Sequence, residues 1–183
     1  MLLKGCLHTH TTCSDGKLSP QKVAYAYESR GYDFIAFTDH DYLLKQNYRD
    51  VYRQVRTGMI VFYGIELSVF VNGNIHVSKI EGNRDLLYIF NHIGEYDFTP
   101  DQLLIRLAAL EKIYPLDAVE ITKKGFRDTV FESLGIAYPK IASDDSHTLT
   151  GIGRAWVEMD AQRDKDSIIK AIRQGDFWNC YLS

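Results

Sequence analysis

Two kinds of segment alternate along the chain, distinguished by the spacing of their hydrophobic positions. Short runs rich in β-branched and aromatic residues, as in buried strands, occupy residues 2–7, 33–38, 59–65, 75–80, 86–91, 118–122, 140–143, 155–159 and 177–182. Two of the segments between them carry helix start signals. Ser19-Pro20 predicts a helix that continues to about Arg30, and the capping box Thr99-Pro100-Asp101-Gln102 predicts one that reaches about Ile113. Further helices are expected at 44–56, 129–134 and 165–174.

This alternation predicts an α/β fold with a mostly parallel sheet. About seven strands in this order favour a closed, TIM-like barrel over an open sheet. The length of 183 residues fits one domain spanning 1–183, because there is no linker, repeat or low-complexity tract.

Composition and charge narrow the possible partners. A hydrophobic content of 45% supports a sizeable core, and the net charge of −3 provides no general positive field to hold long nucleic acid. The cysteines Cys6, Cys13 and Cys180 have no CxxC spacing, so we expect reduced thiols. The first residues do not resemble a signal peptide, and no apolar run approaches the ~20 residues that span a bilayer. We expect a cytoplasmic protein with no membrane partner, of undetermined oligomeric state.

Histidine and acidic side chains recur at the ends of the predicted strands. In a parallel barrel, the carboxyl ends of all strands open onto one face, so these side chains are expected to meet there. Strand residues i and i+2 point to the same side, and the pairs His8/His10 and Asp145/His147 can therefore each chelate one ion. The candidate metal ligands are His8, His10, Asp15, His40, Glu66, His76, His92, Asp145 and His147. Nine imidazole and carboxylate groups exceed the needs of one ion and suit two or three divalent ions of Zn, Fe or Mn.

These motifs resemble those of the PHP family, the polymerase and histidinol phosphatase domains. The matching segments are His8-Thr9-His10-Thr11-Thr12-Cys13-Ser14-Asp15-Gly16, Phe37-Thr38-Asp39-His40-Asp41, Glu66, Phe90-Asn91-His92-Ile93 and Asp145-Ser146-His147. The resemblance implies a distorted (β/α)7 barrel, a trinuclear metal site and phosphoester hydrolysis. The stretch Asn83–Asn91 is short for the family, and His92 is not followed by the proline often found there.

The resemblance also implies how the ligands divide among three ions. His8, His10, Glu66 and Asp145 would hold the first. Glu66, His76 and His92 would hold the second, with Glu66 bridging, and Asp15, His40 and His147 would hold the third.

The expected reaction is attack of water or hydroxide on phosphorus, activated by the metal ions, with Asp145, His40 and Glu66 as catalytic residues. Lys123, Lys124 and Arg127 follow the strand that ends near Glu120, and Arg154 follows Gly151-Ile152-Gly153. Among these basic residues, Lys123, Arg127 and Arg154 are the candidates for holding a substrate phosphate.

Several neighbouring residues have more than one interpretation. Asp39 either fixes an imidazole tautomer or caps a turn, and Glu120 either contacts substrate or supports the barrel. Cys13 and Ser14 are expected to be spectators rather than nucleophiles, because no dedicated base or GxSxG turn accompanies them.

The expected partner is a small phosphorylated substrate, a phosphomonoester or a nucleotide. Three alternatives stay open. One is a metallohydrolase of a non-phosphate ester or amide bond, since the same ions polarise a carbonyl. Another is a non-catalytic metal-binding regulatory module. The third is an exonuclease acting on long nucleic acid, which the acidic charge balance disfavours.

Overall fold

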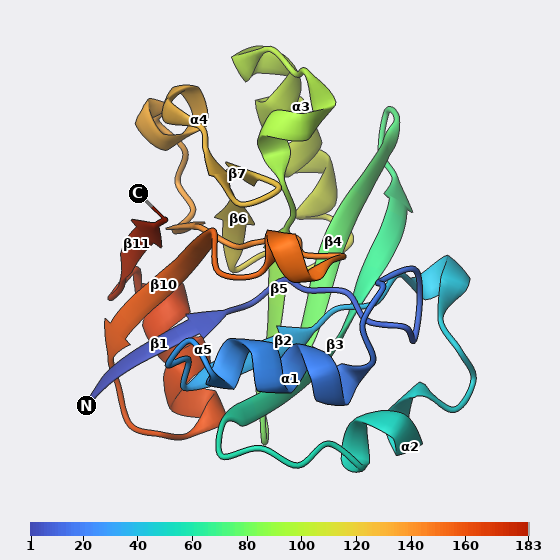
Figure 1. The fold of residues 1–183 in the computed structure, drawn as a ribbon. Coiled ribbons are helices and arrows are strands. Elements are labelled where there is room, and N and C mark those ends of the chain that lie inside the picture. Colours follow the sequence, from blue (N-terminus) through green and yellow to red (C-terminus); the bar gives the residue numbers. More distant parts are fainter. Residues whose placement is uncertain (183) are drawn as a thin grey trace.

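A nine-stranded sheet, curled into a nearly closed barrel, dominates the computed structural model, which describes residues 1–182 (Figure 1). Its strands are β1 (Leu2–Cys6), β2 (Phe34–Phe37), β3 (Ile60–Phe70), β4 (Asn74–Glu81), β5 (Leu86–Phe90), β6 (Ala118–Glu120), β9 (Lys140–Ile141), β10 (Ala155–Asp160) and β11 (Trp178–Tyr181). They are ordered β11-β10-β1-β2-β3-β4-β5-β6-β9. A separate hairpin consists of β7 (Thr122–Lys123) and β8 (Phe126–Arg127).

The direction of the strands differs from the sequence-based expectation. Four of the eight strand pairs in the barrel are antiparallel, so the prediction of a mostly parallel sheet was wrong. The short turns 71–73 and 82–85 flank β4 and leave no room for the crossover that a parallel connection requires. Reversal is confined to β4 and β10, and the other seven strands run in one direction. The fold is therefore a distorted TIM-like barrel.

Side chains and single bridges close the barrel where the main-chain ladder does not. The gap lies between β9 and β11, where the Asn179 amide accepts a hydrogen bond from Ala142 N (2.7 Å) and donates one to Lys140 O (2.8 Å). Beyond β9, Ser146 forms a parallel bridge with Thr9 of the chain after β1. The strands at the two ends of the sheet order are thus tied together.

The helices are shorter than or close to their predicted lengths. They are α1 (Pro20–Glu28), α2 (Tyr48–Arg53), α3 (Pro100–Leu110), α4 (Thr129–Ser133) and α5 (Lys165–Gln174), with 3-10 turns η1 (Asp41–Leu43), η2 (Ile93–Tyr96) and η3 (Leu149–Gly151). Both predicted start signals are confirmed, because Ser19 accepts from Lys22 N and the Thr99–Gln102 capping box is formed. The predicted helix 44–56 was too long, since only α2 and a preceding turn form there. Within residues 1–182, every helix falls short of the length and apolarity that crossing a membrane would require.

The main core fills the barrel interior. Inward-facing side chains such as Leu3, Phe34 and Val157 pack against Ile168 and Ile172 of α5. On the outside, α1 and α2 cover β2 and neighbouring strands, while α3 packs against β4, β5 and β6. Most candidate ligands lie just beyond the carboxyl ends of the co-directional strands, whereas Glu66 lies within β3 and His76 on the reversed strand β4.

Candidate metal centre

Backbone hydrogen bonds extend the strand pairing beyond the carboxyl ends of the strands into the segments that carry the candidate ligands. His10 N donates to Ser146 O (2.9 Å), Thr38 N donates to Thr9 O (2.9 Å), and Glu66 N donates to Asp39 O (3.1 Å). His40 and Glu66 also form an isolated parallel bridge. The histidine-bearing segments are therefore held at fixed positions relative to one another rather than on free loops.

All nine predicted ligands lie in one cluster, with Glu66 at its centre. The Glu66 carboxylate is fully buried and faces His8 Nε2 (3.2 Å), His10 Nε2 (3.3 Å), His40 Nδ1 (2.9 Å) and His92 Nε2 (3.1 Å). The description of Glu66 as the residue that ends a strand was wrong. It lies within β3, which continues to Phe70 because the hairpin partner β4 prolongs the ladder.

The remaining carboxylates lie on either side of His10. Asp145 Oδ1 is 3.2 Å from His10 Nε2 and 3.4 Å from His8 Nε2. Asp15 lies nearer the surface, with its oxygens 3.7 Å from His10 Nδ1 and 3.4 Å from His147 Nε2. His76 Nδ1, on β4, is 3.4 Å from Glu66 Oε1.

Within the described residues, three sets of side chains bring their donor atoms within 4.8 Å of one another. They are His10/Asp15/His40/His147, His8/His10/Glu66 and His40/Glu66/His76. The first set contains the three residues that the family resemblance assigns to one ion. The third differs from the expected Glu66/His76/His92 set by containing His40, although His92 also contacts Glu66.

Among residues 1–182, two buried ring nitrogens of the cluster have no hydrogen-bond partner, as expected for atoms that face a cation. They are His10 Nδ1 and His92 Nδ1. His8 Nε2 and His10 Nε2 are only 3.1 Å apart, so two imidazole lone pairs converge unless a proton or cation lies nearby. Mixed imidazole and carboxylate donors in this arrangement fit divalent ions such as Zn, Fe or Mn.

The backbone is in an uncommon conformation at two of the nine positions. His92 (φ 32°) and Asp145 (φ 46°) adopt the left-handed region, which non-glycine residues rarely occupy. Such conformations persist where the surrounding structure enforces them, often at functional sites.

The charges of the cluster shift the proton affinities of its members in opposite directions. Burial disfavours the charged form of His8, but Glu120, Glu66 and Asp145 outweigh it and raise the His8 pKa well above its ordinary value. The pKa of His10 rises to about 9 for the same kind of reason, with Asp145 and Glu66 as partners. Burial is likewise outweighed at Glu66, where His8 and the other imidazoles hold the pKa well below normal.

Two residues that support the cluster were not identified as such from the sequence. Glu120 Oε2 lies 2.7 Å from His8 Nδ1, the ring nitrogen that faces away from Glu66, and Asn91 Nδ2 donates to Glu66 Oε1 (2.8 Å). Glu120 is the last residue of a buried strand and is itself fully buried, a position that could have indicated this role. No such signal distinguished Asn91.

Asp39 and Asp144 hold the loops of the site rather than its imidazoles. Asp39 accepts hydrogen bonds from Thr11 N (2.8 Å), from the Thr11 and Ser14 hydroxyls (both 2.6 Å) and from the Tyr52 hydroxyl. It therefore fixes the turn that leads to Asp15, in agreement with the turn-capping interpretation. Asp144 accepts from three successive backbone N–H groups, of residues 153–155, and from the Tyr27 hydroxyl.

The candidate phosphate-binding residues occupy different surroundings. Arg154 borders a cavity of about 420 Å³ that is also lined by Asp15, Asp145, His147 and Lys124. Lys123 and Arg127 are exposed on the β7–β8 hairpin and do not line that cavity. Arg127 instead pairs with Glu132 at 2.8 Å.

Comparison with known proteins gives the class to which this barrel and cluster belong. The family model "PHP domain" matches residues 7–170. The chain therefore belongs to the PHP family. A 43-residue stretch, 24% of the chain, is 46% identical to the DNA polymerase/3'-5' exonuclease PolX of Bacillus subtilis (strain 168), and this match spans 8% of that protein.

Two solved structures share the fold at low sequence identity. One is a two-domain protein from Bacteroides vulgatus that contains a predicted PHP-like metal-dependent phosphoesterase, with TM-score 0.73 and 18% identity. That likeness covers 99% of this chain and 65% of the other. The second is the lesion-specific endonuclease PfuEndoQ from Pyrococcus furiosus, with TM-score 0.70, 15% identity, and coverage of 100% and 60%. The chain is thus shorter than either protein.

Proposed function

We propose that the protein is a metal-dependent phosphoesterase that hydrolyses a small phosphomonoester or nucleotide. The cluster of nine imidazole and carboxylate groups around Glu66 carries this proposal, because it offers donors for two or three divalent ions beside a cavity that Asp15, Asp145 and His147 line. When bound, such ions lower the pKa of a water molecule and neutralise charge on phosphoryl oxygens.

The protein's own residues would hold and position these components. His8, His10, Glu66 and Asp145 are the proposed donors for one ion, and Glu66 with His76 and His92 for a second. Asp15, His40 and His147 are the proposed donors for a third. Among these, Asp145, His40 and Glu66 are the proposed catalytic residues.

The cavity beside the cluster suits a small anionic substrate. Its volume of about 420 Å³ lies in the range of ordinary small-molecule pockets. Arg154 and Lys124 border it, and the Arg154 guanidinium can donate hydrogen bonds to two phosphoryl oxygens side by side. Both cations lie on the same cavity as Asp145 and His147, so the phosphoryl group would be held next to the proposed ions.

The nearby nucleophilic side chains are poorly placed to attack a substrate. Cys13 is buried, and that burial raises the pKa of its thiol, which leaves it less reactive. The Ser14 hydroxyl donates to Asp39 (2.6 Å). This supports attack by water rather than by a side chain.

The test compares wild type, Asp145→Asn and the exposed control Asp176→Asn. Metal content per chain is measured by elemental analysis, and turnover by release of inorganic phosphate from mononucleotides and p-nitrophenyl phosphate. We expect two or three ions and turnover in wild type and control. In Asp145→Asn, turnover should fall to the no-enzyme rate with an unchanged circular dichroism spectrum. Wild-type turnover in Asp145→Asn would refute the mechanism.

Competition and salt dependence separate the rival substrates. Inorganic phosphate should inhibit a phosphoesterase at modest concentration, whereas the hydrolase of an amide or carboxylic ester would be insensitive. The name of the Bacillus subtilis relative, an exonuclease, makes nucleic acid the second candidate substrate. Cleavage of oligonucleotides that exceeds mononucleotide turnover and weakens steeply with salt would favour it.

A further inference from the structure

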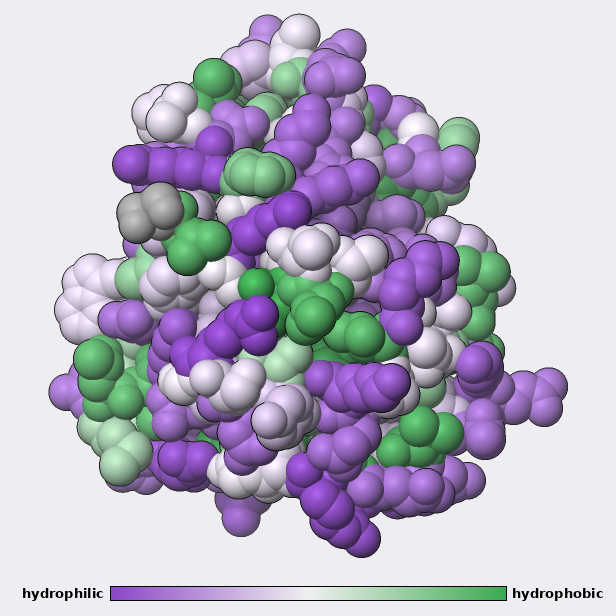
Figure 2. Space-filling model, in the orientation of Figure 1, coloured by the Kyte–Doolittle hydropathy of each residue, from purple (hydrophilic) through white to green (hydrophobic). Residues whose placement is uncertain are grey.

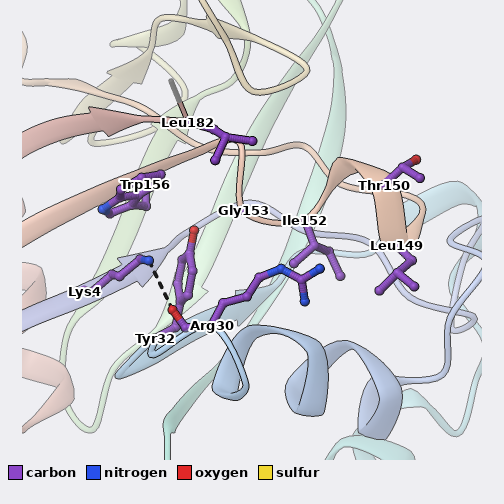
Figure 3. A pocket seen from close by; sticks show the side chains of 9 residues that line it. All are labelled: Lys4, Arg30, Tyr32, Leu149, Thr150, Ile152, Gly153, Trp156 and Leu182. Carbon is purple, nitrogen blue, oxygen red and sulfur yellow. Dashed lines mark hydrogen bonds between the residues drawn. The ribbon is translucent and has the colours of Figure 1, made fainter.

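A second cavity, of about 400 Å³, is lined in part by Leu149 and Thr150 of η3 (Figure 3). None of the residues that line it also lines the cavity at the cluster. Lys4 and Arg30 supply its positive charge, Tyr32 and Trp156 its aromatic walls, and Ile152 with Leu182 part of its apolar rim. Figure 2 shows apolar side chains gathered near the centre of this face, between η3 and α1, within a mostly hydrophilic surface.

The two cations of this cavity have no carboxylate partner. Among the described residues, neither Lys4 nor Arg30 takes part in an ion pair. The Lys4 ammonium lies 4.2 Å from the centre of the Tyr32 ring and 4.3 Å from that of Trp156, and it donates to Arg30 O (3.2 Å). Glu158, opposite Lys4 in the β1–β10 pair, accepts a hydrogen bond from Trp156 Nε1 instead. Two positive charges therefore remain available to a ligand.

The buried hydroxyl of Tyr32 is a further indication of a ligand site. Tyr32 is 4% exposed, and its hydroxyl oxygen makes no hydrogen bond to any of residues 1–182. Figure 3 shows the Tyr32 ring between Lys4 and the Arg30 side chain, with its hydroxyl pointing toward Gly153 on the cavity wall. Leaving such a group unpaired costs free energy, which a bound acceptor would remove. The Arg30 guanidinium has five N–H donors and gives one hydrogen bond within the described part of the chain, to Ala26 O (2.7 Å).

From these observations we propose that this cavity binds a small organic anion, a phosphate or carboxylate head group attached to an apolar body. The head group accepts hydrogen bonds from Lys4, Arg30 and the Tyr32 hydroxyl. The body lies against Trp156, Ile152 and Leu182. This assignment is independent of the proposed reaction, because it uses no residue of the metal cluster.

Trp156 serves as the reporter in the test. The chain has two tryptophans, so the experiment uses metal-free full-length protein carrying Trp178→Phe, in which Trp156 is the sole indole. The probes are phenylphosphonate, benzoate, inorganic phosphate and the neutral benzyl alcohol. We expect a saturable change in fluorescence with phenylphosphonate or benzoate, a weaker response to inorganic phosphate, and none with benzyl alcohol. The two organic anions show which head group is preferred, and inorganic phosphate shows whether the apolar body is needed.

Substitutions show whether the fluorescence change arises from binding in this cavity. Lys4→Met and the exposed Arg30→Gln should each weaken binding by roughly tenfold or more, since each removes a charged hydrogen bond. Tyr32→Phe should weaken it by a smaller factor. Lys112→Met, an exposed lysine after α3, and Asp145→Asn in the metal cluster should leave binding unchanged. Three outcomes would overturn the proposal. Benzyl alcohol could bind as well as the anions, or neither organic anion could give a saturable fluorescence change. In the third, Asp145→Asn would lose anion binding while Arg30→Gln binds normally.

Discussion

The contact between Glu120 and His8 leads to a quantitative prediction about metal binding. Glu120 Oε2 and His8 Nδ1 are 2.7 Å apart, and both side chains are buried. A carboxylate at this position keeps the ring proton on Nδ1, so that the lone pair of Nε2 faces Glu66 and Asp145. The Thr122 hydroxyl, 3.0 Å from Glu120 Oε1, fixes the carboxylate in turn. We therefore treat Glu120 as a positioning residue for His8.

The size of the effect follows from this single contact. A hydrogen bond to a charged group contributes about 1.5–3 kcal/mol, and a buried one is screened little by solvent. Because about 1.4 kcal/mol corresponds to a factor of ten, this equals a change of roughly 10- to 100-fold in metal affinity. Mutations of carboxylates that support ligating histidines cost a similar ~10–100-fold. Glu120→Gln keeps the shape of the side chain and an acceptor oxygen but removes its charge.

The measurement is a metal titration of the metal-free protein against a competing chelator, with ions per chain at saturation determined by elemental analysis. Glu120→Gln should bind metal about 10- to 100-fold more weakly, with an unchanged number of ions. Glu111→Gln is the matched control, because its carboxylate accepts a hydrogen bond from Tyr138 on the surface, and it should behave as wild type. Unchanged affinity in Glu120→Gln would refute the positioning role. Fewer ions at saturation would show that Glu120 is itself a ligand.

Further predictions concern protons and the closure of the barrel. In metal-free protein the pKa values of His8, His10 and His92 are raised, so protonation of these residues stabilises the fold below about pH 6.5. This stabilisation is lost as the pH rises toward about 9, the pKa of His10. The melting temperature of the metal-free protein should therefore fall as the pH rises from about 6.5 to about 9. Metal binding should strengthen over the same range, because protons cease to compete for the imidazoles. A melting temperature of the metal-free protein that rises with pH would contradict the assigned role of these protons. Asn179→Ala leaves Ala142 N and Lys140 O without partners, which should cost about 2–4 kcal/mol in urea unfolding. Exposed Asn83→Ala should cost under about 1 kcal/mol, and equal costs for the two variants would mean that the Asn179 link contributes nothing special.

Local sequence signals were sufficient to predict most elements and the composition of the cluster. The helix caps at Ser19 and Thr99 depend on contacts within four residues, so they could be identified without knowledge of the fold. The candidate ligands were found because imidazoles and carboxylates followed apolar runs, and strands running the same way bring their ends to one face. The metal-binding and catalytic roles of those residues stay predictions until metal content and turnover are measured.

Tertiary structure decided three further features. They are the direction of β4 and β10, the extension of β3 past Glu66, and the support that Glu120 and Asn91 give to the cluster. The sequence from Met59 to Ile65 reads as a complete strand, and only pairing with β4 prolongs it to Phe70. Glu120 lies 112 positions from His8 along the chain, so no local pattern connects them. Periodicity reports which residues avoid water, because burial depends on the local alternation of side chains. It does not report which distant polar group satisfies a buried one, since that depends on how the barrel closes.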